Sequence, residues 1–346
     1  LESTQYDLLI IGAGITGCGI ARDAALRGMA VALVDARDIA AGTSSRSSKL
    51  IHGGMRYMAS GQLTVVKEAS IERKTLRRIA PHLTQPTSML LPAPSRGAVL
   101  KLKTAMVAYE TLGEVAKQDR HVVWNLDTLK ENEPTLITKK LVGAVVYPEY
   151  KTDDARLTLA NAQSARAAGV DILTYAPVTE ILTENGKACG AILGDALGTS
   201  GGRIRAKLII NATGPWLDAV RKLEETVARP KLQLTKGIHV VLKRDRLPIQ
   251  NTVIMPAPDK RSNFAVPHGD FVYFGTTDTF YRDADYSPEI TREDIDYLME
   301  SGSNSFNQGP FSDDDIVSLW SGVRPLLAQK NKKPSEISRK NETLHG

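Results

Sequence analysis

The chain has 346 residues, 42% of them hydrophobic, which suits a substantial core in two domains or one large one. Its net charge of +5 comes from dispersed basic residues that are not interleaved with aromatic ones, so we expect no nucleic acid as a partner. An ordinary basic surface, an anionic substrate and an anionic membrane surface all remain open explanations of that charge.

The two cysteines, Cys18 and Cys189, lie far apart in the sequence and do not have the spacing of a metal site. So few cysteines argue against a disulfide framework and suit a reducing compartment. No apolar run reaches the length of a membrane-spanning helix, and the polar amino terminus leads directly into the first predicted strand. We therefore expect a cytoplasmic protein without a signal peptide, either free or bound peripherally at the inner face of the plasma membrane. The oligomeric state stays open.

The first predicted unit is a strand, a glycine-rich turn and a helix. Residues 8–11 form a short apolar run typical of a buried parallel strand, and small and aliphatic residues follow at helical spacing over 15–27. Between them, Gly12, Gly14 and Gly17 form a G-x-G-x-x-G motif. The first glycine permits the tight turn, the second lets the backbone approach a pyrophosphate, and the third lets helix and strand pack closely. The amide groups at the helix start then face the phosphates.

A second apolar run over residues 29–34 predicts the next strand of the same unit. It ends at Asp35, where an acidic side chain can accept hydrogen bonds from the ribose hydroxyls of an adenosine. A G-x-G-x-x-G motif alone is a weak signal, but here strand, glycines, helix, strand and acid follow in the expected order. We therefore predict a bound dinucleotide rather than a glycine-rich turn without a ligand.

Residues 38–57 are rich in serine and glycine but also contain large residues such as Leu50, His52 and Tyr57. A flexible linker would not need those side chains, so this segment is predicted to wrap closely around a flat cofactor. Residues 62–79 then have the periodicity of an amphipathic helix, which ends before Pro81.

Residues 82–150 lack the alternating strand and helix pattern of the preceding region. Within them, residues 98–112 are apolar on one side and present Lys101 and Lys103 on the other. Two interpretations stay open: a helix that faces the protein core, and a helix that lies on an anionic membrane surface.

The alternating pattern returns after Asp153, which with Asp154 can cap a helix over residues 155–168 that ends at Gly169. Strand-like runs follow at 170–175, 177–183, 188–193 and 207–211, with a hairpin turn at Asn185-Gly186. The last run leads into Ala212-Thr213-Gly214, a second feature of flavoproteins with this kind of fold.

Residues 230–280 predict a separate antiparallel sheet, because short alternating runs are separated by turns such as His268-Gly269-Asp270. Its strands are expected at 238–242, 253–255, 263–266 and 271–275. A helix near 291–301 with Thr291 as its N-cap and a strand at 316–320 follow.

These elements divide the chain into two interleaved domains. We expect a cofactor-binding domain over 1–81, 151–225 and 315–346, and a substrate domain over 82–150 and 226–314. Because each chain crossing brings residues of the second domain over the cofactor, the site is predicted between the two domains.

Six segments together resemble the FAD-dependent, aerobic-type glycerol-3-phosphate dehydrogenase family. In the expected order they read IGAGITGCGIARDAALRG at 11–28, TSSRSSKLIHGGMRY at 43–57, DDARL at 153–157, NATGPW at 211–216, GTTD at 275–278 and DDIVSLWSGVRPL at 314–326. Each motif is modest alone, and the ordered series is specific. The family continues into a Gly-Gly-Lys segment and a helical C-terminal domain, so we expect a C-terminally truncated member.

The resemblance implies an α/β and α+β fold, in which a Rossmann-like FAD-binding domain with a β-meander is interleaved with a substrate domain built on an antiparallel sheet. It implies oxidation of sn-glycerol 3-phosphate to dihydroxyacetone phosphate, with hydride transfer from C2 to flavin N5 and electrons passed to a quinone. A glycerol-3-phosphate oxidase that uses oxygen and an FAD amine or amino-acid oxidase are the alternatives. Two further alternatives are an NAD enzyme and a non-catalytic piece that binds a nucleotide without turnover. We expect no bound metal.

The residues that the resemblance assigns to FAD come from the predicted turns and from the serine-rich segment. They are Gly12, Gly14, Ile15, Thr16, Gly17, Asp35, Ala36, Thr43, Ser44, Ser45, Ser48, Lys49, Leu50, His52, Gly53, Gly54, Val178, Ala212, Thr213, Gly214, Trp216, Gly322 and Arg324.

Four arginines match family positions that line the substrate pocket: Arg56, Arg261, Arg324 and Arg339. Arginine suits the phosphate of the substrate because its planar guanidinium can bond two oxygens at once. The sequence therefore predicts a cluster of guanidinium groups across from the cofactor.

Removal of the hydroxyl proton requires a base, and histidine can accept a proton near neutral pH. His52 is the first candidate and Tyr57 the second, with His239 as a weaker one. Thr277 and Asp278 match a turn beside the substrate, where they are expected to orient the hydroxyl or a partner arginine.

Overall fold

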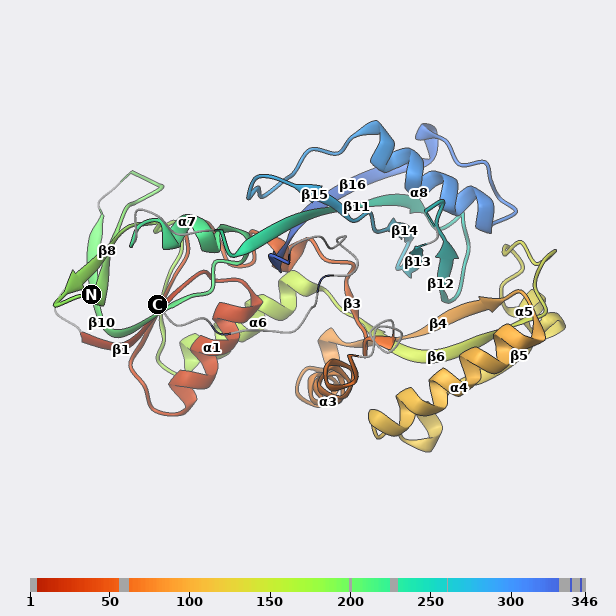
Figure 1. Cartoon of the computed structure of the whole chain (residues 1–346), viewed down its shortest axis with the longest axis horizontal. Coiled ribbons are helices and arrows are strands. Elements are labelled where there is room, and N and C mark those ends of the chain that lie inside the picture. Colours follow the sequence, from red (N-terminus) through yellow and green to blue (C-terminus); the bar gives the residue numbers. More distant parts are fainter. Residues whose placement is uncertain are drawn as a thin grey trace.

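The computed structural model describes residues 5–55, 62–198, 201–224, 230–259 and 261–329, together with Ile337 and Thr343. Its strands form two sheets that follow one another along the long axis of the molecule, as Figure 1 shows. One sheet has six strands and the other has ten.

The six-stranded sheet has the order β7 (Asp171–Leu173), β2 (Val31–Val34), β1 (Gln5–Ile11), β10 (Gly202–Asn211), β9 (Lys187–Leu193) and β8 (Val178–Glu184). The first four strands are parallel, and β9 and β8 continue the sheet as an antiparallel meander. The predicted Rossmann-like sheet with a β-meander is confirmed, and the β8–β9 hairpin turns at Asn185-Gly186 as expected.

Burial on both faces of this sheet explains the continuous apolar run in β1. Leu8 and Ile10 belong to a core shared with α1 (Ile15–Leu26) and α6 (Asp154–Ala167). Leu9 and Ile11 belong to a second core, which they share with residues of the meander.

The turn between β1 and α1 depends on two glycines. Gly12 has a φ of +107°, a conformation that other residues rarely adopt. A Cβ at Gly17 would lie 1.8 Å from the carbonyl oxygen of Gly12, so only glycine lets the first turn of α1 pack this closely on the end of β1. The amino end of α1 is thereby fixed just beyond the carboxyl end of β1.

The ten-stranded sheet has the order β15 (Thr279–Tyr281), β11 (Leu232–Lys243), β14 (Phe271–Gly275), β13 (Ser262–His268), β12 (Thr252–Pro256), β4 (Gln85–Ala93), β6 (Gly143–Lys151) and β3 (Leu50–Ile51). In addition, β16 (Ile316–Leu327) pairs with β11, and β5 (Val122–Asn125) pairs with β6. The pairings are antiparallel except for β12 with β4, which is parallel. The expected antiparallel sheet is therefore present with one parallel junction, and strands from residues 82–150 extend it.

The strand β16 is longer than the one expected at 316–320, and it pairs with β11 over its whole length. It also contacts η1 (Thr43–Ser45) and η4 (Gly214–Trp216), which flank the first sheet. The assignment of residues 315–346 to the cofactor domain stays a prediction, because β16 is hydrogen-bonded to the second sheet while it touches elements beside the first.

Two long helices, α8 and α4, pack on different strands of the second sheet. α8 (Arg292–Ser305) packs on β11 and β14 through Leu298, and α4 (Arg96–Leu112) packs on β4 and β6 through Met106 and Tyr109. Further helices among the described residues are α3 (Leu63–Ile79), which contacts α4, and the short α5 (Leu126–Asn132), α7 (Leu217–Arg221), η2 (Pro81–Leu83), η3 (Lys117–Asp119) and η5 (Asp313–Asp315). Within the described ranges no helix is both long and apolar enough to cross a membrane.

Replacing Gly17 with alanine should lower the free energy of unfolding by about 1–3 kcal/mol, because the added methyl group must displace the Gly12 backbone. Gly19 is the matched control, since it lies in the same helix and a Cβ there would meet no atom within 4 Å. Gly19→Ala should leave stability unchanged or raise it by about 0.5–1 kcal/mol. Urea unfolding measures both changes, and equal effects at the two positions would contradict the close packing of Gly17.

Candidate active site

A cavity of about 430 Å³ lies at the start of α1, beyond the carboxyl ends of β1, β2 and β10. Open α/β sheets bind their ligands in this kind of crevice. Many of the residues assigned to FAD line it: Gly12, Gly14, Ile15, Thr16, Asp35, Ala36, Thr43, Ser44, Val178, Ala212, Thr213, Gly214 and Trp216. Gly17 lies beneath them, against the backbone of Gly12.

Asp35 holds the turn between β1 and α1 closed. Its Oδ2 accepts a hydrogen bond from the amide of Ala13 at 2.6 Å, and its Oδ1 accepts one from the amide of Arg37 at 2.8 Å. Burial raises the pKa of this carboxyl, against the opposing effect of those two amides. Each carboxylate oxygen has a second lone pair, so Asp35 can still accept from a ribose hydroxyl.

The cavity fits a dinucleotide such as FAD. A Cβ at Gly14 would lie 3.2 Å from the Oγ of Ser44, which also accepts a hydrogen bond from the amide of Ile15 at 2.9 Å. The first turn of α1 contains no acidic side chain that would compete with a phosphate for its amide groups. Apolar side chains such as Val220 and Leu223 line another part of the cavity, where a flat aromatic base can pack.

Several lining residues were not predicted: Ile11, Ala41, Gly42, Ala176, Pro177, Pro215, Ala219, Val220, Leu223, Tyr286 and Pro325. Tyr286 comes from the loop between β15 and α8, and its ring stacks on Trp216 with centroids 4.1 Å apart. The guanidinium of Arg37 lies 4.1 Å from the centre of the same tyrosine ring. No local sequence signal indicates this contact, because its partners are distant in the chain.

The serine-rich segment is fixed first by Asp154 at the start of α6. Its Oδ2 accepts from the amide and the hydroxyl of Ser47 at 3.0 and 2.6 Å, and its Oδ1 accepts from Lys49 Nζ at 2.7 Å. The ion pair is mostly shielded, since the side chains of Lys49 and Asp154 are 24% and 11% exposed. Asp154, predicted only as a helix cap, therefore also positions this segment.

The second sheet holds the same segment from the other side. The hydroxyl of Tyr273 donates to the carbonyl of Ser48 at 2.7 Å, and the indole of Trp320 donates to the carbonyl of Ser47 at 3.3 Å. Gly322 lets β16 approach this segment, because a Cβ there would lie 2.6 Å from the Cβ of Arg46. Ser48 is thus fixed where the two sheets meet.

His239 lies behind Ser48 and is 1% exposed. Its Nε2 is 2.8 Å from the Oγ of Ser48, and its ring stacks on Trp320 with centroids 4.4 Å apart. Its Nδ1 has no hydrogen-bond partner within the part of the chain that the structure describes. Burial, together with the positive charges of Arg324 and Lys49, holds the pKa of His239 well below 6.5.

Arg324 reaches the turn that follows β14. Its Nη2 donates to Thr276 Oγ1 at 2.8 Å, and its Nη1 donates to the carbonyl of Thr277 at 3.2 Å and to Asp278 Oδ1 at 3.3 Å. A Cβ at Gly237 would lie 2.3 Å from Nη2, so the guanidinium occupies the space that a side chain at this one position of β11 would fill. Neither Gly237 nor Thr276 was predicted, although both shape this position.

Arg261 reaches the same turn. Its Nη1 donates to the carbonyl of Asp278 at 3.5 Å, and its Nε donates to Asp259 at 2.6 Å. Asp278 accepts from Arg324, whereas the hydroxyl of Thr277 is buried and accepts from the amide of Ile238. The roles predicted for both residues beside the substrate stay predictions. Two of the four predicted arginines therefore converge on residues 276–278.

His52 is exposed and directly follows β3, whose residues Leu50 and Ile51 are paired with β6. Gly53 and Gly54, which come next, are buried. Ser45 lies in η1. Arg56, Tyr57 and Arg339 lie outside the described residues, so their predicted roles stay predictions.

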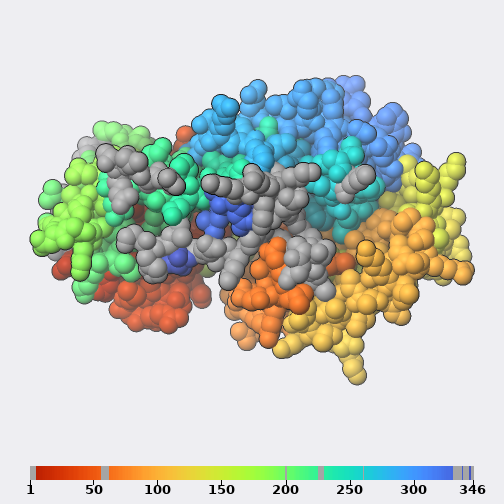
Figure 2. All heavy atoms as spheres, viewed as in Figure 1, coloured from red at the N-terminus to blue at the C-terminus, as the bar shows by residue number. Residues whose placement is uncertain are grey.

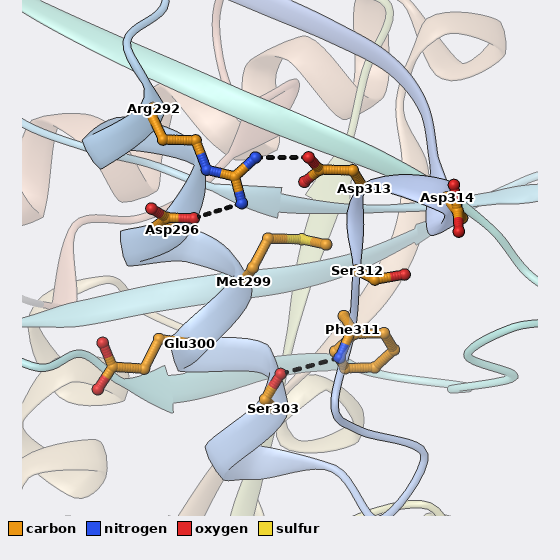
Figure 3. A pocket seen from close by; sticks show the side chains of 9 residues that line it. All are labelled: Arg292, Asp296, Met299, Glu300, Ser303, Phe311, Ser312, Asp313 and Asp314. Atoms are coloured by element: carbon orange, nitrogen blue, oxygen red, sulfur yellow. Dashed lines mark hydrogen bonds and ion pairs between the residues drawn. The ribbon is translucent and has the colours of Figure 1, made fainter.

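A larger hollow of about 620 Å³ lies between α8 and η5 and contains none of the predicted site residues. Figure 3 shows Arg292 between Asp296 and Asp313, to which it is paired at 2.8 and 2.5 Å. The three side chains are 56–61% exposed, so this is a solvated ion-pair network on the surface.

Comparison with known proteins points to one class of enzyme. Residues 7–338 match the profile of the family described as FAD dependent oxidoreductase. The curated proteins from Staphylococcus haemolyticus and Bacillus subtilis named aerobic glycerol-3-phosphate dehydrogenase are each 42% identical to it, over 100% and 99% of this chain. The chain spans 63% and 62% of the length of these two relatives.

Solved structures agree in fold. Glycerol-3-phosphate dehydrogenase from Bacillus halodurans, solved in complex with FAD, has a TM-score of 0.77 at 36% sequence identity. The match covers 94% of this chain and 58% of the Bacillus halodurans chain. An L-alpha-glycerophosphate oxidase from Mycoplasma pneumoniae with FAD bound reaches 0.76 at 19% identity, over 95% of this chain and 85% of its own. A glycine oxidase from Bacillus cereus reaches 0.67 at 21% identity, over 93% and 83%.

The buried position of His239 predicts a loss of stability in acid. Its folded-state pKa is depressed, so the neutral ring contributes stability above pH 6.5 that is lost as the pH falls toward the folded-state pKa. Between about pH 7.5 and pH 5.0, the advantage of the wild type over His239→Asn in free energy of unfolding should shrink by roughly 2 kcal/mol. Urea unfolding at both pH values tests this. A constant difference would show that the folded protein protonates His239 as readily as the unfolded chain does.

Proposed function

The chain belongs to the FAD dependent oxidoreductase family, and on that premise we propose that it oxidises sn-glycerol 3-phosphate to dihydroxyacetone phosphate. The names of the relatives reported above support this substrate. The main structural support is that Arg261 and Arg324 converge on the turn formed by residues 276–278.

The two arginines would hold the phosphate group. A phosphate monoester carries nearly two negative charges at neutral pH, so a pair of guanidinium groups matches it better than one does. The side chains of Arg324 and Arg261 are 26% and 30% exposed, which leaves both accessible to a ligand. Asp278 and Asp259 orient them and partly balance their charge before the substrate binds.

The hydroxyl proton would pass to His52. His239, the other histidine at this site, is a poor acceptor, because burial and two nearby cations disfavour its charged form. His52 is exposed and lies in the same segment as Ser48, so a substrate can reach it without opening the core. His239 would instead hold Ser48 in place through Nε2.

FAD would be held by the backbone around Gly12 and Gly14, by Asp35, by residues 212–214 and by the serine-rich segment. When bound, FAD supplies the acceptor for the two electrons that leave the substrate carbon. The chain itself contributes binding, orientation and the acceptor for the proton.

The oxygen-using oxidase and the FAD amine or amino-acid oxidase remain the competing assignments, and solved oxidases of both kinds share the fold. An amino acid presents a single carboxylate, for which one arginine suffices. The convergence of two arginines on one turn therefore favours the phosphate substrate.

The final electron acceptor would be a quinone, reached at an anionic membrane surface. On α4, Leu100 and Val107 are 66% and 50% exposed, and Lys101 and Lys103 lie exposed beside them. Figure 2 shows α3 in orange and α4 in amber side by side on one surface of the molecule, and the two helices are in contact. Such a surface combines apolar insertion with attraction to anionic lipid.

Vesicles that contain anionic lipid should sediment the protein, and Leu100→Asp should weaken that binding by roughly tenfold. Leu197→Asp is the matched control, because Leu197 is 70% exposed on the loop after β9. Absence of binding by the wild type would remove the membrane proposal and favour oxygen as the acceptor.

Anaerobic mixing of the FAD-loaded protein with glycerol 3-phosphate should bleach the flavin absorbance, whereas glycine and sarcosine should not. Arg324→Ala should raise KM for glycerol 3-phosphate by about 30- to 100-fold, because it removes charge-assisted hydrogen bonds to the phosphate. Its effect with glycerol, which has no phosphate, should be small.

Arg292→Ala is the control for that variant, since Arg292 is an exposed arginine with carboxylate partners in the surface network of Figure 3. It should leave KM unchanged. Bleaching by glycine but not by glycerol 3-phosphate would assign the protein to the amino-acid oxidases instead.

A further inference from the structure

A buried polar network lies beside His52, and no step described above uses it. Glu149 of β6 is 1% exposed, and its two carboxylate oxygens accept from the amide of Gly53 at 3.0 and 3.2 Å. Tyr109 of α4 donates to Oε1 at 3.1 Å, and Arg73 of α3 donates to Oε2 at 2.5 Å. Side chains of two helices therefore hold the carboxylate that binds this backbone amide, next to the proposed proton acceptor.

We infer that Glu149 is a positioning residue for His52, which it holds through the amide of Gly53. The inference rests on the proposed function, since it concerns the residue that would accept the proton. The Gly53 nitrogen belongs to the planar peptide that also contains the Cα and carbonyl of His52. Fixing that amide therefore restricts the backbone from which the imidazole extends.

The register of the sheet supports this assignment. β3 pairs with β6 as Leu50 with Lys151 and Ile51 with Tyr150, and continuing that register sets His52 opposite Glu149. The described ladder ends at Ile51, and the carboxylate of Glu149 then binds the amide that follows His52. His52 is consequently attached to β6 on both sides, by the ladder before it and by a side chain after it.

Steric contact restricts the same peptide. A Cβ at Gly53 would lie 1.8 Å from the hydroxyl oxygen of Tyr109, so the phenol occupies the space of a side chain at this position. Burial and the charge of Glu149 raise the pKa of Tyr109, which keeps the phenol protonated as a donor. The amide of Gly53 therefore cannot shift toward α4 without displacing Tyr109.

The ion pair between Arg73 and Glu149 is costly to bury. The side chains of Arg73 and Glu149 are 6% and 1% exposed, and removing two charges from water costs several kcal/mol. Replacing such a pair with packed apolar residues is often neutral for stability. Apolar residues at positions 73 and 149 could fill the same space, but they could not accept a hydrogen bond from the amide of Gly53 as Glu149 does.

The test compares Glu149→Gln with Glu133→Gln in the FAD-loaded protein. Glu133 is the matched control, because it is also fully buried and accepts the amides of Gln250 and Asn251 at 2.9 and 2.6 Å. An amide at position 149 must turn an N–H toward either Gly53 or Arg73, so one hydrogen bond is lost. Tyr109→Phe is a second variant that removes one donor and leaves the ion pair intact, in case Glu149→Gln does not fold.

The first readout is the imidazole signal of His52 in NMR spectra of histidine-labelled protein, assigned by its loss in His52→Asn. Glu149→Gln should shift and broaden it, Tyr109→Phe should shift it less in the same direction, and Glu133→Gln should leave it unchanged. An unchanged His52 signal in both Glu149→Gln and Tyr109→Phe would overturn the inference.

The second readout is kinetic. Glu149→Gln should lower kcat for glycerol 3-phosphate by about 10- to 100-fold with little change in KM, because a displaced base slows the reaction without weakening phosphate binding. In combination with His52→Asn it should add little. A full additional loss in the double variant would contradict action through His52. If no form of the protein oxidises glycerol 3-phosphate, the proposed function fails, and the NMR comparison alone still decides whether Glu149 positions His52.

Discussion

The contact between Gly17 and the backbone of Gly12 is the constraint on which the remaining geometry depends. It brings the first turn of α1 against the end of β1, where a side chain at position 17 would overlap the Gly12 carbonyl. Asp35 then closes the turn by accepting from the amide of Ala13. The result is a helix start that opens on a cavity at the carboxyl ends of parallel strands, the place where such sheets bind a dinucleotide.

The serine-rich segment connects that cavity to the second sheet. Asp154 holds it from the side of the first sheet, and Tyr273, Trp320 and His239 hold it from the second. Because β11, β14 and β16 also position Arg324 beside the turn at 276–278, the cofactor cavity and the arginine proposed to bind phosphate are supported by the same strands. Glu149 extends this support to His52 from α3 and α4, the helices that we propose to lie near the membrane.

The sequence predicted those features that local periodicity or turn chemistry determines. The first strand, the glycine turn, α1, α6 and the meander were found because their signals span few residues. The contacts between Gly237 and Arg324, between Trp216 and Tyr286, and between Glu149 and Gly53 were missed, because their partners meet only after both sheets have formed. The length of β16 was also missed, since its pairing with β11 extends it beyond its own alternating residues. The roles predicted for site residues remain proposals.

A crystal structure of the chain with FAD bound tests the central claim most directly. We expect density for the diphosphate beside the backbone of residues 12–17, with the flavin ring extending toward Ser48 and His52 and facing Arg324. Density for the diphosphate elsewhere, or a flavin ring directed away from the serine-rich segment, would contradict it.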